Sequence, residues 1–223
     1  MRLEIPSEYR KGFTKFLNCK VDLSKRVFIP RIETEFWVNQ VIKEIQKFTE
    51  VHPLLKVLDI FAGSGCIGIA ILKNIKNSSV DFVDIDKKAI EQIRINLKLN
   101  NISKFRYKIY QSNLFEKING KYDVIFANPP YVARERIKEV ESSVLKYEPK
   151  IALLAGKRGM QYIKKFLKGA RNFLKPKGVI YLELDPLQEK EIEDILNREK
   201  YKNFKFFKDQ FKKYRFLKVK KNN

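Results

Sequence analysis

Apolar residues along this chain fall into two alternating patterns. Short apolar runs predict strands at residues 55–61, 80–86, 105–110, 122–127 and 179–184, and two closing strands near 203–208 and 214–219. Apolar positions at helical spacing predict helices at about residues 35–49, from 69 onward, 87–100, 159–174 and 187–198. Because strands and helices alternate throughout, we expect an α/β fold with a parallel sheet and right-handed crossovers.

The first 26 residues show neither pattern. They are polar and irregular, and Phe13, Phe16 and Leu17 are the side chains expected to anchor them. The chain of 223 residues is long enough for one sizeable core. We therefore expect a short N-terminal extension over residues 1–26 and a single domain over residues 27–223. Thr34 is the candidate N-cap of the helix at 35–49.

A glycine-rich turn, residues 62–68, connects the strand at 55–61 to an apolar helix. A glycine-rich turn between a strand and a helix is typical of a ligand-binding loop. Gly63 and Gly65 allow a ligand to approach the backbone and the free N–H groups at the start of the helix. Asp59, a carboxylate beside this loop, favours a cationic ligand group over a pyrophosphate. Asp84 ends the next strand, where an acid usually accepts from ribose hydroxyls. Asp86 is the alternative, or else it caps the following helix.

The segment Asn128-Pro129-Pro130-Tyr131 directly follows the buried-looking strand at 122–127. Two prolines cannot continue a strand, so the Asn128 side chain is held at the carboxyl end of a parallel strand, where ligands bind in open α/β sheets. The Asn128 carboxamide oxygen and the Pro129 carbonyl form a pair of acceptors that suits the two hydrogens of a planar NH2 group. The alternative interpretation is an ordinary strand-ending turn.

Composition narrows the class of protein. The chain has two cysteines, Cys19 and Cys66, and one histidine, His52, which excludes a disulfide framework, a cysteine-rich metal site and histidine-dependent triads. No apolar stretch reaches the roughly 20 residues that span a bilayer, and the N-terminus does not resemble a signal peptide. We therefore expect a cytoplasmic protein without a bound metal.

The net charge of +21 raises the hypothesis of contact with nucleic acid. Lysine is spread along the whole chain, as a composition bias would also produce. Residues 198–221 concentrate it, but there lysine alternates with tyrosine and phenylalanine, which is typical of a half-exposed strand.

Several short motifs together resemble one family, the release-factor glutamine methyltransferases (HemK/PrmC-like), from about Phe16 to Leu217. These motifs are Phe28-Ile29-Pro30-Arg31, Glu33-Thr34-Glu35, Val57-Leu58-Asp59, Gly63-Ser64-Gly65, Val83-Asp84-Ile85, Asn128-Pro129-Pro130-Tyr131, Tyr147-Glu148-Pro149, Ala152-Leu153, Gly156, Gly159, Leu182-Glu183, Gln188, Asp209 and Arg215. The Asn-Pro-Pro-Tyr segment is also found in adenine N6-methyltransferases. The Pro-Arg and Tyr-Glu-Pro segments are more specific to the glutamine enzymes.

The resemblance implies a Rossmann-like fold with seven strands, mostly parallel, and helices on both faces, dependent on S-adenosylmethionine. The implied substrate is the N5 nitrogen of the glutamine in the Gly-Gly-Gln loop of a peptide chain release factor, a partner in translation termination. The implied catalytic residues are Asn128, Pro129, Pro130 and Tyr131. The implied cofactor residues are Asp59, Phe61, Ala62, Gly63, Ser64, Gly65, Asp84, Asn113, Leu114 and Asn128.

The sequence departs from the family pattern in three places. Members often carry glycine and a hydroxyl residue at the positions of Phe61 and Ala62, so we expect a crowded loop. They often carry an acid and an aromatic residue at the positions of Asn113 and Leu114, so we expect altered adenine contacts. Most of the family's N-terminal helical domain has no counterpart in this sequence.

These departures leave three alternatives. Two are other substrates: a glutamine of a ribosomal protein, and the adenine N6 amino group of DNA or RNA. The third is that the chain is an RNA-binding module without enzymatic activity. The basic surface also suits contact with the ribosome or RNA, and we expect a monomer that does not bind membranes.

Overall fold

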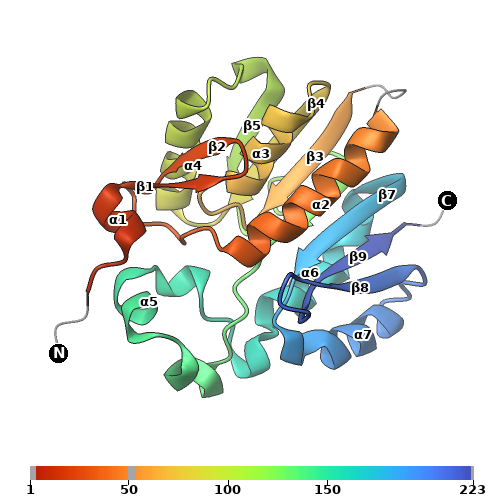
Figure 1. Ribbon diagram of the computed structural model, residues 1–223. Helices are drawn as coiled ribbons and strands as arrows, with labels where there is room; N and C mark the ends of the chain where they lie inside the picture. Colours follow the sequence, from red (N-terminus) through yellow and green to blue (C-terminus); the bar gives the residue numbers. More distant parts are fainter. Residues whose placement is uncertain (1–3, 50–53, 222–223) are drawn as a thin grey trace.

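The computed structural model describes residues 4–49 and 54–221, so His52 lies outside the described residues. A seven-stranded sheet with the order β5-β4-β3-β6-β7-β9-β8 forms its centre (Figure 1). The strands are β3 (Leu55–Ile60), β4 (Ser78–Asp84), β5 (Tyr107–Gln111), β6 (Tyr122–Ala127), β7 (Leu174–Glu183), β8 (Phe204–Lys208) and β9 (Tyr214–Lys220). The first five strands in the sheet order are parallel, and β9 is antiparallel to both of its neighbours. The predicted α/β fold with a mostly parallel sheet is confirmed.

Helices cover both faces of the sheet. One core packs α2 (Ile32–Thr49), α3 (Cys66–Asn74) and α4 (Lys87–Leu99), and the other packs α6 (Gln161–Ala170) and α7 (Glu189–Arg198). Successive side chains of β6 show why both faces must be covered, since Val124 and Phe126 enter the first core and Ile125 and Ala127 enter the second. Within residues 4–49 and 54–221, no helix combines the length and apolarity needed to cross a bilayer.

Some predicted boundaries need correction. Thr34 does not cap a helix, because α2 already begins at Ile32. The helix predicted to reach residue 174 ends at Ala170, and a 3-10 turn (Arg171–Phe173) follows it. Strand β7 begins at Leu174 rather than at 179, since the chain pairs with Tyr122 before a register shift and only then joins the regular ladder.

The N-terminal segment is ordered, so the expectation of an irregular extension was wrong. It forms α1 (Ser7–Lys11) and a hairpin of β1 (Phe13–Phe16) and β2 (Cys19–Asp22). Phe16 is buried as expected of an anchor, and Val21 joins it in the core that contains α2, α3 and α4. The division of the chain at residue 26 stays a prediction, although hairpin and domain share this core.

Three buried amide side chains, two on α4 and one at its C-cap, hold the hairpin and the turn after it in place. Gln92, Asn96 and Asn100 are four residues apart, so they lie on one face of the helix. They accept from the backbone N–H groups of Lys25 (2.9 Å), Asp22 (2.7 Å) and Lys20 (3.1 Å), respectively. Asn96 Nδ2 also donates to the carbonyl of Ser64 (2.9 Å) in the glycine-rich loop. This face of α4, the amide ladder, replaces the neighbouring strand that the hairpin backbone lacks.

Candidate active site

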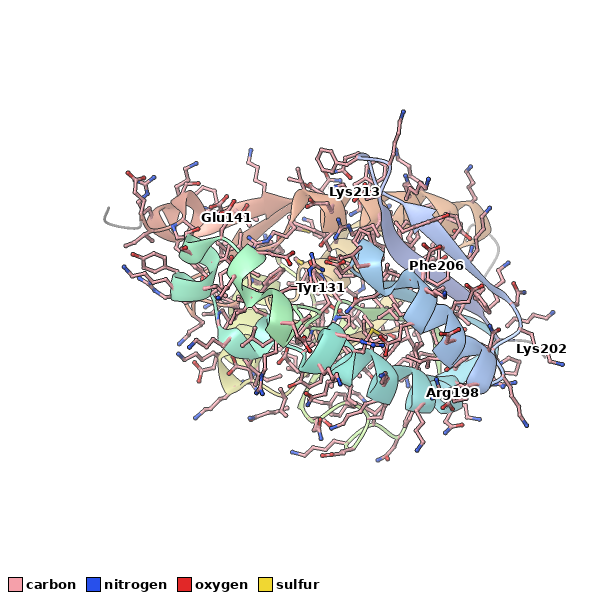
Figure 2. All side chains as sticks on the ribbon, turned by 90° about the horizontal axis from the view of Figure 1, so that it is seen from below. Tyr131, Glu141, Arg198, Lys202, Phe206 and Lys213 are labelled. Atoms are coloured by element: carbon pink, nitrogen blue, oxygen red, sulfur yellow. The ribbon has the colours of Figure 1, made fainter. Side chains whose placement is uncertain are left out.

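A cavity of about 270 Å³ lies at the carboxyl edge of the parallel strands. The strand order reverses there, between β3 and β6, which is where open α/β sheets bind ligands. Seen from below relative to Figure 1, Tyr131 lies near the middle of the molecule, between Glu141 and Phe206 in this view (Figure 2). The predicted site residues that line the cavity are Phe61, Ala62, Gly63, Ser64, Asp84, Asn113, Leu114, Asn128, Pro129, Pro130 and Tyr131.

One end of the cavity is formed by the loops after β3, β4 and β5, and we call it the cofactor end. The backbone of these loops is tied strand to strand, with Ala62 N–H donating to the Val83 carbonyl (3.1 Å) and Ser112 N–H to the Asp84 carbonyl (2.9 Å). Gly63 adopts φ +55°, and a side chain added there would meet no other atom. A ligand can therefore lie directly on this stretch of backbone.

The Asp84 carboxylate faces this loop. It accepts from the N–H of Gly63 (2.8 Å) and of Asp86 (2.9 Å). Burial raises the pKa of Asp84 to about 6, and the backbone N–H bonds oppose this rise. Asp86 accepts from Lys88 N–H (2.9 Å) and caps α4, as expected for this alternative.

Two predicted cofactor residues do not line the cavity. Asp59 is 1% exposed and accepts from Gly68 N–H (2.9 Å) in the first turn of α3. Because side chains alternate along a strand, Asp59 points to the face covered by α3 and not over the strand end. Its burial raises the pKa of Asp59 to about 8. Gly65 (φ +78°) is the N-cap residue of α3 and faces Ile93. Neither residue lines the cavity, and direct cofactor contact by them stays a prediction.

We expected Phe61 to crowd the loop, but it does not. Its ring centroid lies 6.1 Å from Tyr162 and 6.2 Å from Phe166, so the ring packs against α6 and the space at Gly63 stays open. Leu114 (φ +52°) lines the same end, and Asn113 Nδ2 donates to Glu116 (2.7 Å).

The opposite end of the cavity is formed by the loop after β6, and we call it the acceptor end. Asn128 is half-buried, Pro129 and Pro130 are buried, and all three line the cavity. Asn128 Nδ2 lies 3.5 Å from the Thr34 hydroxyl, which leaves the Asn128 oxygen unengaged by this contact. The Tyr131 hydroxyl lies in a buried region beside Glu183, and burial raises the pKa of Tyr131.

The Pro-Arg and Tyr-Glu-Pro segments, to which the sequence assigned no role, meet at the wall of the acceptor end. Arg31 forms a 2.5 Å ion pair with Glu148, whose side chain is fully buried, and Glu148 also accepts from Ile29 N–H (3.2 Å). The Arg31 guanidinium lies over the Phe28 ring, 4.6 Å from its centroid. Burial raises the pKa of Glu148, and the charge of Arg31 opposes this rise. The Pro-Arg and Tyr-Glu-Pro segments are thus two halves of one wall.

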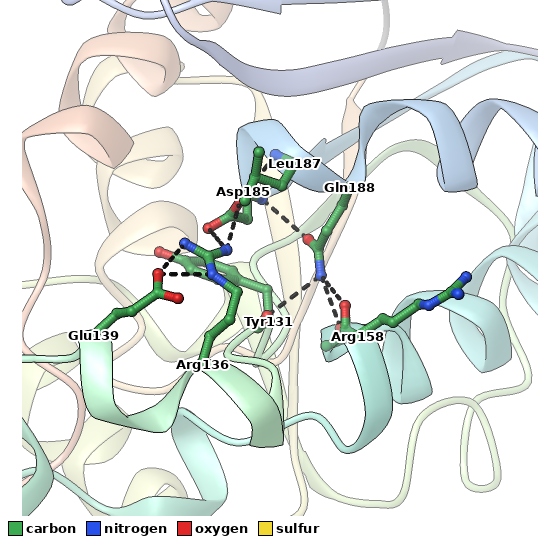
Figure 3. A network of polar contacts seen from close by, with 8 residues as sticks. Tyr131, Arg136, Glu139, Arg158, Asp185, Leu187 and Gln188 are labelled. Atoms are coloured by element: carbon green, nitrogen blue, oxygen red, sulfur yellow. Dashed lines mark hydrogen bonds and ion pairs between the residues drawn. The ribbon is translucent and has the colours of Figure 1, made fainter.

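Side chains of the segment after β7 also hold the loop that contains Tyr131 (Figure 3). Gln188 Nε2 donates to the carbonyls of Tyr131 (3.3 Å) and Gly159 (3.0 Å), and Asp185 beside it pairs with Arg136 (3.3 Å). A side chain at Gly159 (φ +69°) would come within 2.0 Å of the Tyr131 carbonyl oxygen. Only glycine therefore allows the loop to pack here. Sequence reasoning noted Gly159 and Gln188 but assigned them no role.

Comparison with known proteins identifies the family. A model described as the methyltransferase small domain matches residues 33–148, just over half of the chain. A release factor glutamine methyltransferase from Lactococcus lactis subsp. lactis is 36% identical over 217 residues, which covers 96% of this chain and 77% of the relative. This chain belongs to the release factor glutamine methyltransferase family. The resemblance drawn from its motifs is confirmed.

Solved structures place this family member in the methyltransferase fold. A ribosomal protein methylase from Lactobacillus delbrueckii subsp. bulgaricus superposes with a TM-score of 0.63 at 20% identity, covering 91% of this chain and 84% of that one. A 16S rRNA methyltransferase from T. thermophilus, in complex with AdoMet and guanosine, gives a TM-score of 0.64 at 17% identity over 94% of this chain and 50% of that one. At these identities the likeness concerns the fold alone.

Proposed function

We propose that this methyltransferase transfers a methyl group from S-adenosylmethionine to the side-chain nitrogen of a glutamine in a peptide chain release factor. The observation that carries the proposal is the acceptor end, where Asn128 follows β6 and faces the same cavity as the cofactor loops. Membership of the family supports the glutamine of the Gly-Gly-Gln loop as the target.

The cofactor end fits S-adenosylmethionine. The open backbone at Gly63 suits close approach of the ligand, and the Asp84 carboxylate suits the ribose hydroxyls. Leu114 and Ile85 offer apolar surface for the adenine, and Asn113 replaces the acid often found in the family. When bound, the cofactor supplies a methyl group on a sulfonium, whose sulfur keeps the electron pair of the broken C–S bond.

The chain's own residues prepare the nucleophile. A carboxamide nitrogen is weakly nucleophilic because its lone pair is delocalised into the carbonyl. Asn128 Oδ1 and the Pro129 carbonyl would each accept one N–H of the substrate, which fixes the nitrogen and directs its lone pair along the cavity. As the N–C bond forms, positive charge grows on nitrogen and both hydrogen bonds strengthen, so they stabilise the transition state more than the ground state. The surplus proton leaves to solvent.

The experiment that tests this proposal is methyl transfer from labelled cofactor to three substrates in parallel: a full-length release factor, ribosomes and double-stranded DNA. We expect label on the release factor alone, at the glutamine of its Gly-Gly-Gln loop, by mass spectrometry of its peptides. A release factor whose target glutamine is replaced by asparagine is the matched control. Label on a ribosomal protein or on adenine would replace the proposed substrate by one of the alternatives, which need the same pair of acceptors.

A further inference from the structure

Two residues from motifs without an assigned role lie directly behind Asn128. Thr34 is in the first turns of α2, and Glu183 is the last residue of β7. Both are only 1% exposed. The Thr34 hydroxyl donates to Glu183 Oε2 at 2.7 Å, and its oxygen lies 3.5 Å from Asn128 Nδ2. A chain of polar atoms therefore runs from the cavity through Asn128 and Thr34 to a buried carboxylate.

The order of donors in this chain follows from the strengths of its bonds. A hydroxyl has one hydrogen, and a bond to a carboxylate is about twice as strong as one to a neutral amide, so Thr34 gives its hydrogen to Glu183. The Thr34 oxygen can then only accept. It accepts from Asn128 Nδ2, whereas a flipped carboxamide would bring two oxygens together. Asn128 Oδ1 is thereby turned toward the cavity.

We propose that Thr34 and Glu183 are positioning residues for the transfer: they hold the Asn128 carboxamide with its oxygen toward the substrate amide and polarise that oxygen through the hydrogen-bonded chain. The substrate named in this inference rests on the proposed function, whereas the orientation of the Asn128 side chain does not. Bonds in such a chain strengthen one another in a buried site, so negative charge at Glu183 makes Asn128 Oδ1 a better acceptor.

The carboxylate itself is firmly held. Trp37 Nε1 donates to the same Glu183 oxygen at 2.7 Å, and the Trp37 ring stacks between Phe126 (6.0 Å) and Phe216 (5.4 Å). This packing holds Glu183 in place. The longest contact of the chain is that of the Asn128 amide, 3.5 Å, and it can shorten when substrate binds.

Burial raises the pKa of Glu183, while the bonds from Trp37 and Thr34 and the charge of Arg215 oppose the rise. The charge of Glu33 adds to it, and the charge of Glu183 in turn helps to raise the pKa of Tyr131. Protonation at acid pH removes the negative charge at the end of the chain. The rate of transfer should then fall with falling pH through the pKa of Glu183.

Steady-state kinetics with the full chain and a full-length release factor test the role in transfer. Thr34→Val keeps the shape but removes the hydroxyl, and Glu183→Gln removes the charge. We expect kcat to fall about tenfold or more in each, the equivalent of one hydrogen bond, with KM and cofactor affinity within about twofold. Thr34→Ser, which restores the hydroxyl, should restore kcat. The acid limb of the kcat profile should vanish in Glu183→Gln.

Glu44→Gln is the matched control. Glu44 lies on the same helix and also contacts the sheet, accepting from the Tyr181 hydroxyl (3.2 Å) and pairing with Lys218, away from the cavity. This substitution should leave kcat and its pH profile unchanged. Unchanged kcat in folded Thr34→Val and Glu183→Gln, as checked by thermal melting, would overturn the role in transfer.

Nuclear magnetic resonance of the free protein tests the orientation without any substrate. The side-chain NH2 signals of Asn128, assigned by their loss in Asn128→Ala, should shift as Glu183 titrates. This shift should disappear in Glu183→Gln and persist in Glu44→Gln. Signals that do not respond to pH or to Thr34→Val would overturn the inference, even if release factor is methylated. A protein that shows these shifts but methylates no release factor would instead refute the proposed function alone.

Discussion

The two ends of the cavity are built in different ways. The cofactor end consists of three loops that each leave a neighbouring parallel strand and are tied to one another by backbone bonds, such as that from Ala62 to Val83. The acceptor end consists of one short loop that is held by side chains from remote parts of the chain. Thr34 lies 94 positions from Asn128, and Gln188 lies 57 positions from Tyr131.

Because of this difference, the two ends should respond differently to the loss of a side chain. At the cofactor end, backbone groups and one carboxylate, Asp84, present a surface to a ligand, so loss of one side chain should weaken binding without disturbing the transfer step. At the acceptor end, buried partners orient a single side chain, Asn128. Loss of a side chain there should affect the rate or the stability of the fold and leave cofactor affinity intact.

The largest expected effect is that of Asn128→Ala. Removing one of two preorganised acceptors should lower kcat by about 10²–10³-fold, by analogy with oxyanion-hole donors. The dissociation constant of S-adenosylmethionine, measured by calorimetry, should stay within about twofold because Asn128 faces the acceptor amide. A large loss of cofactor affinity would contradict the assignment of Asn128 to the acceptor amide.

Arg31→Ala should be the next largest, as a loss of stability. It leaves the buried Glu148 carboxylate without its cation, which typically costs about 3–5 kcal/mol. Because the pKa of Glu148 is raised, acid neutralises the carboxyl and the loss should shrink as pH falls. Urea unfolding at several pH values measures this.

A matched control for that variant is Lys25→Ala. Lys25 pairs with Glu91, and both side chains are more than a third exposed. Its removal should cost less than about 1 kcal/mol. Equal losses in the two variants would mean that the wall at Arg31 is not a buried pair in solution.

Asp59→Asn tests whether this carboxyl is a buried structural group and not a ligand contact. Its pKa is raised from 3.8 to about 8, so between these values the folded protein retains a proton that the unfolded chain has released. Folding of the native protein therefore weakens as pH rises, by up to about 1.4 kcal/mol per pH unit. The Asn side chain of the variant does not titrate. Its free energy of unfolding, relative to that of the native protein, should therefore rise by about 2 kcal/mol between pH 6 and pH 7.5. Parallel stability curves, or a tenfold loss of cofactor affinity, would contradict the assignment.

The smallest effect is that of Asp84→Ala, which should raise the dissociation constant of the cofactor about tenfold or more, or about 1.4 kcal/mol and upward. With the native protein, affinity should also fall as pH drops below about 6, because Asp84 then takes up a proton. Single-turnover transfer at saturating cofactor should be little changed. Unchanged calorimetric affinity would move the ribose contact to Asp86.

The contrast between the ends also explains what the sequence could predict. Strand β6 has the predicted bounds, and the loops of the cofactor end follow from local rules about where parallel strands end and where glycine is needed. For Asp59, the alternation of side chains along β3, and not nearness to the loop, decides where the side chain points.

The partners of the acceptor end depend on contacts across the fold, which no local pattern specifies. Arg31 and Glu148 are 117 residues apart, and Thr34 and Glu183 are 149 apart. The hairpin at 13–22 escaped prediction for a similar reason: β1 pairs locally with β2, but the backbone N–H groups of Lys20 and Asp22 bond to side chains 80 and 74 residues away.

The amide ladder links the N-terminal hairpin to the cofactor loop. Asn96 bonds both the Asp22 backbone and the Ser64 carbonyl, so one side chain contacts both segments. We expect a ligand that orders residues 61–65 to make detachment of the hairpin rarer. The backbone amides of Lys20 and Asp22 should then exchange their hydrogens more slowly when the cavity is filled.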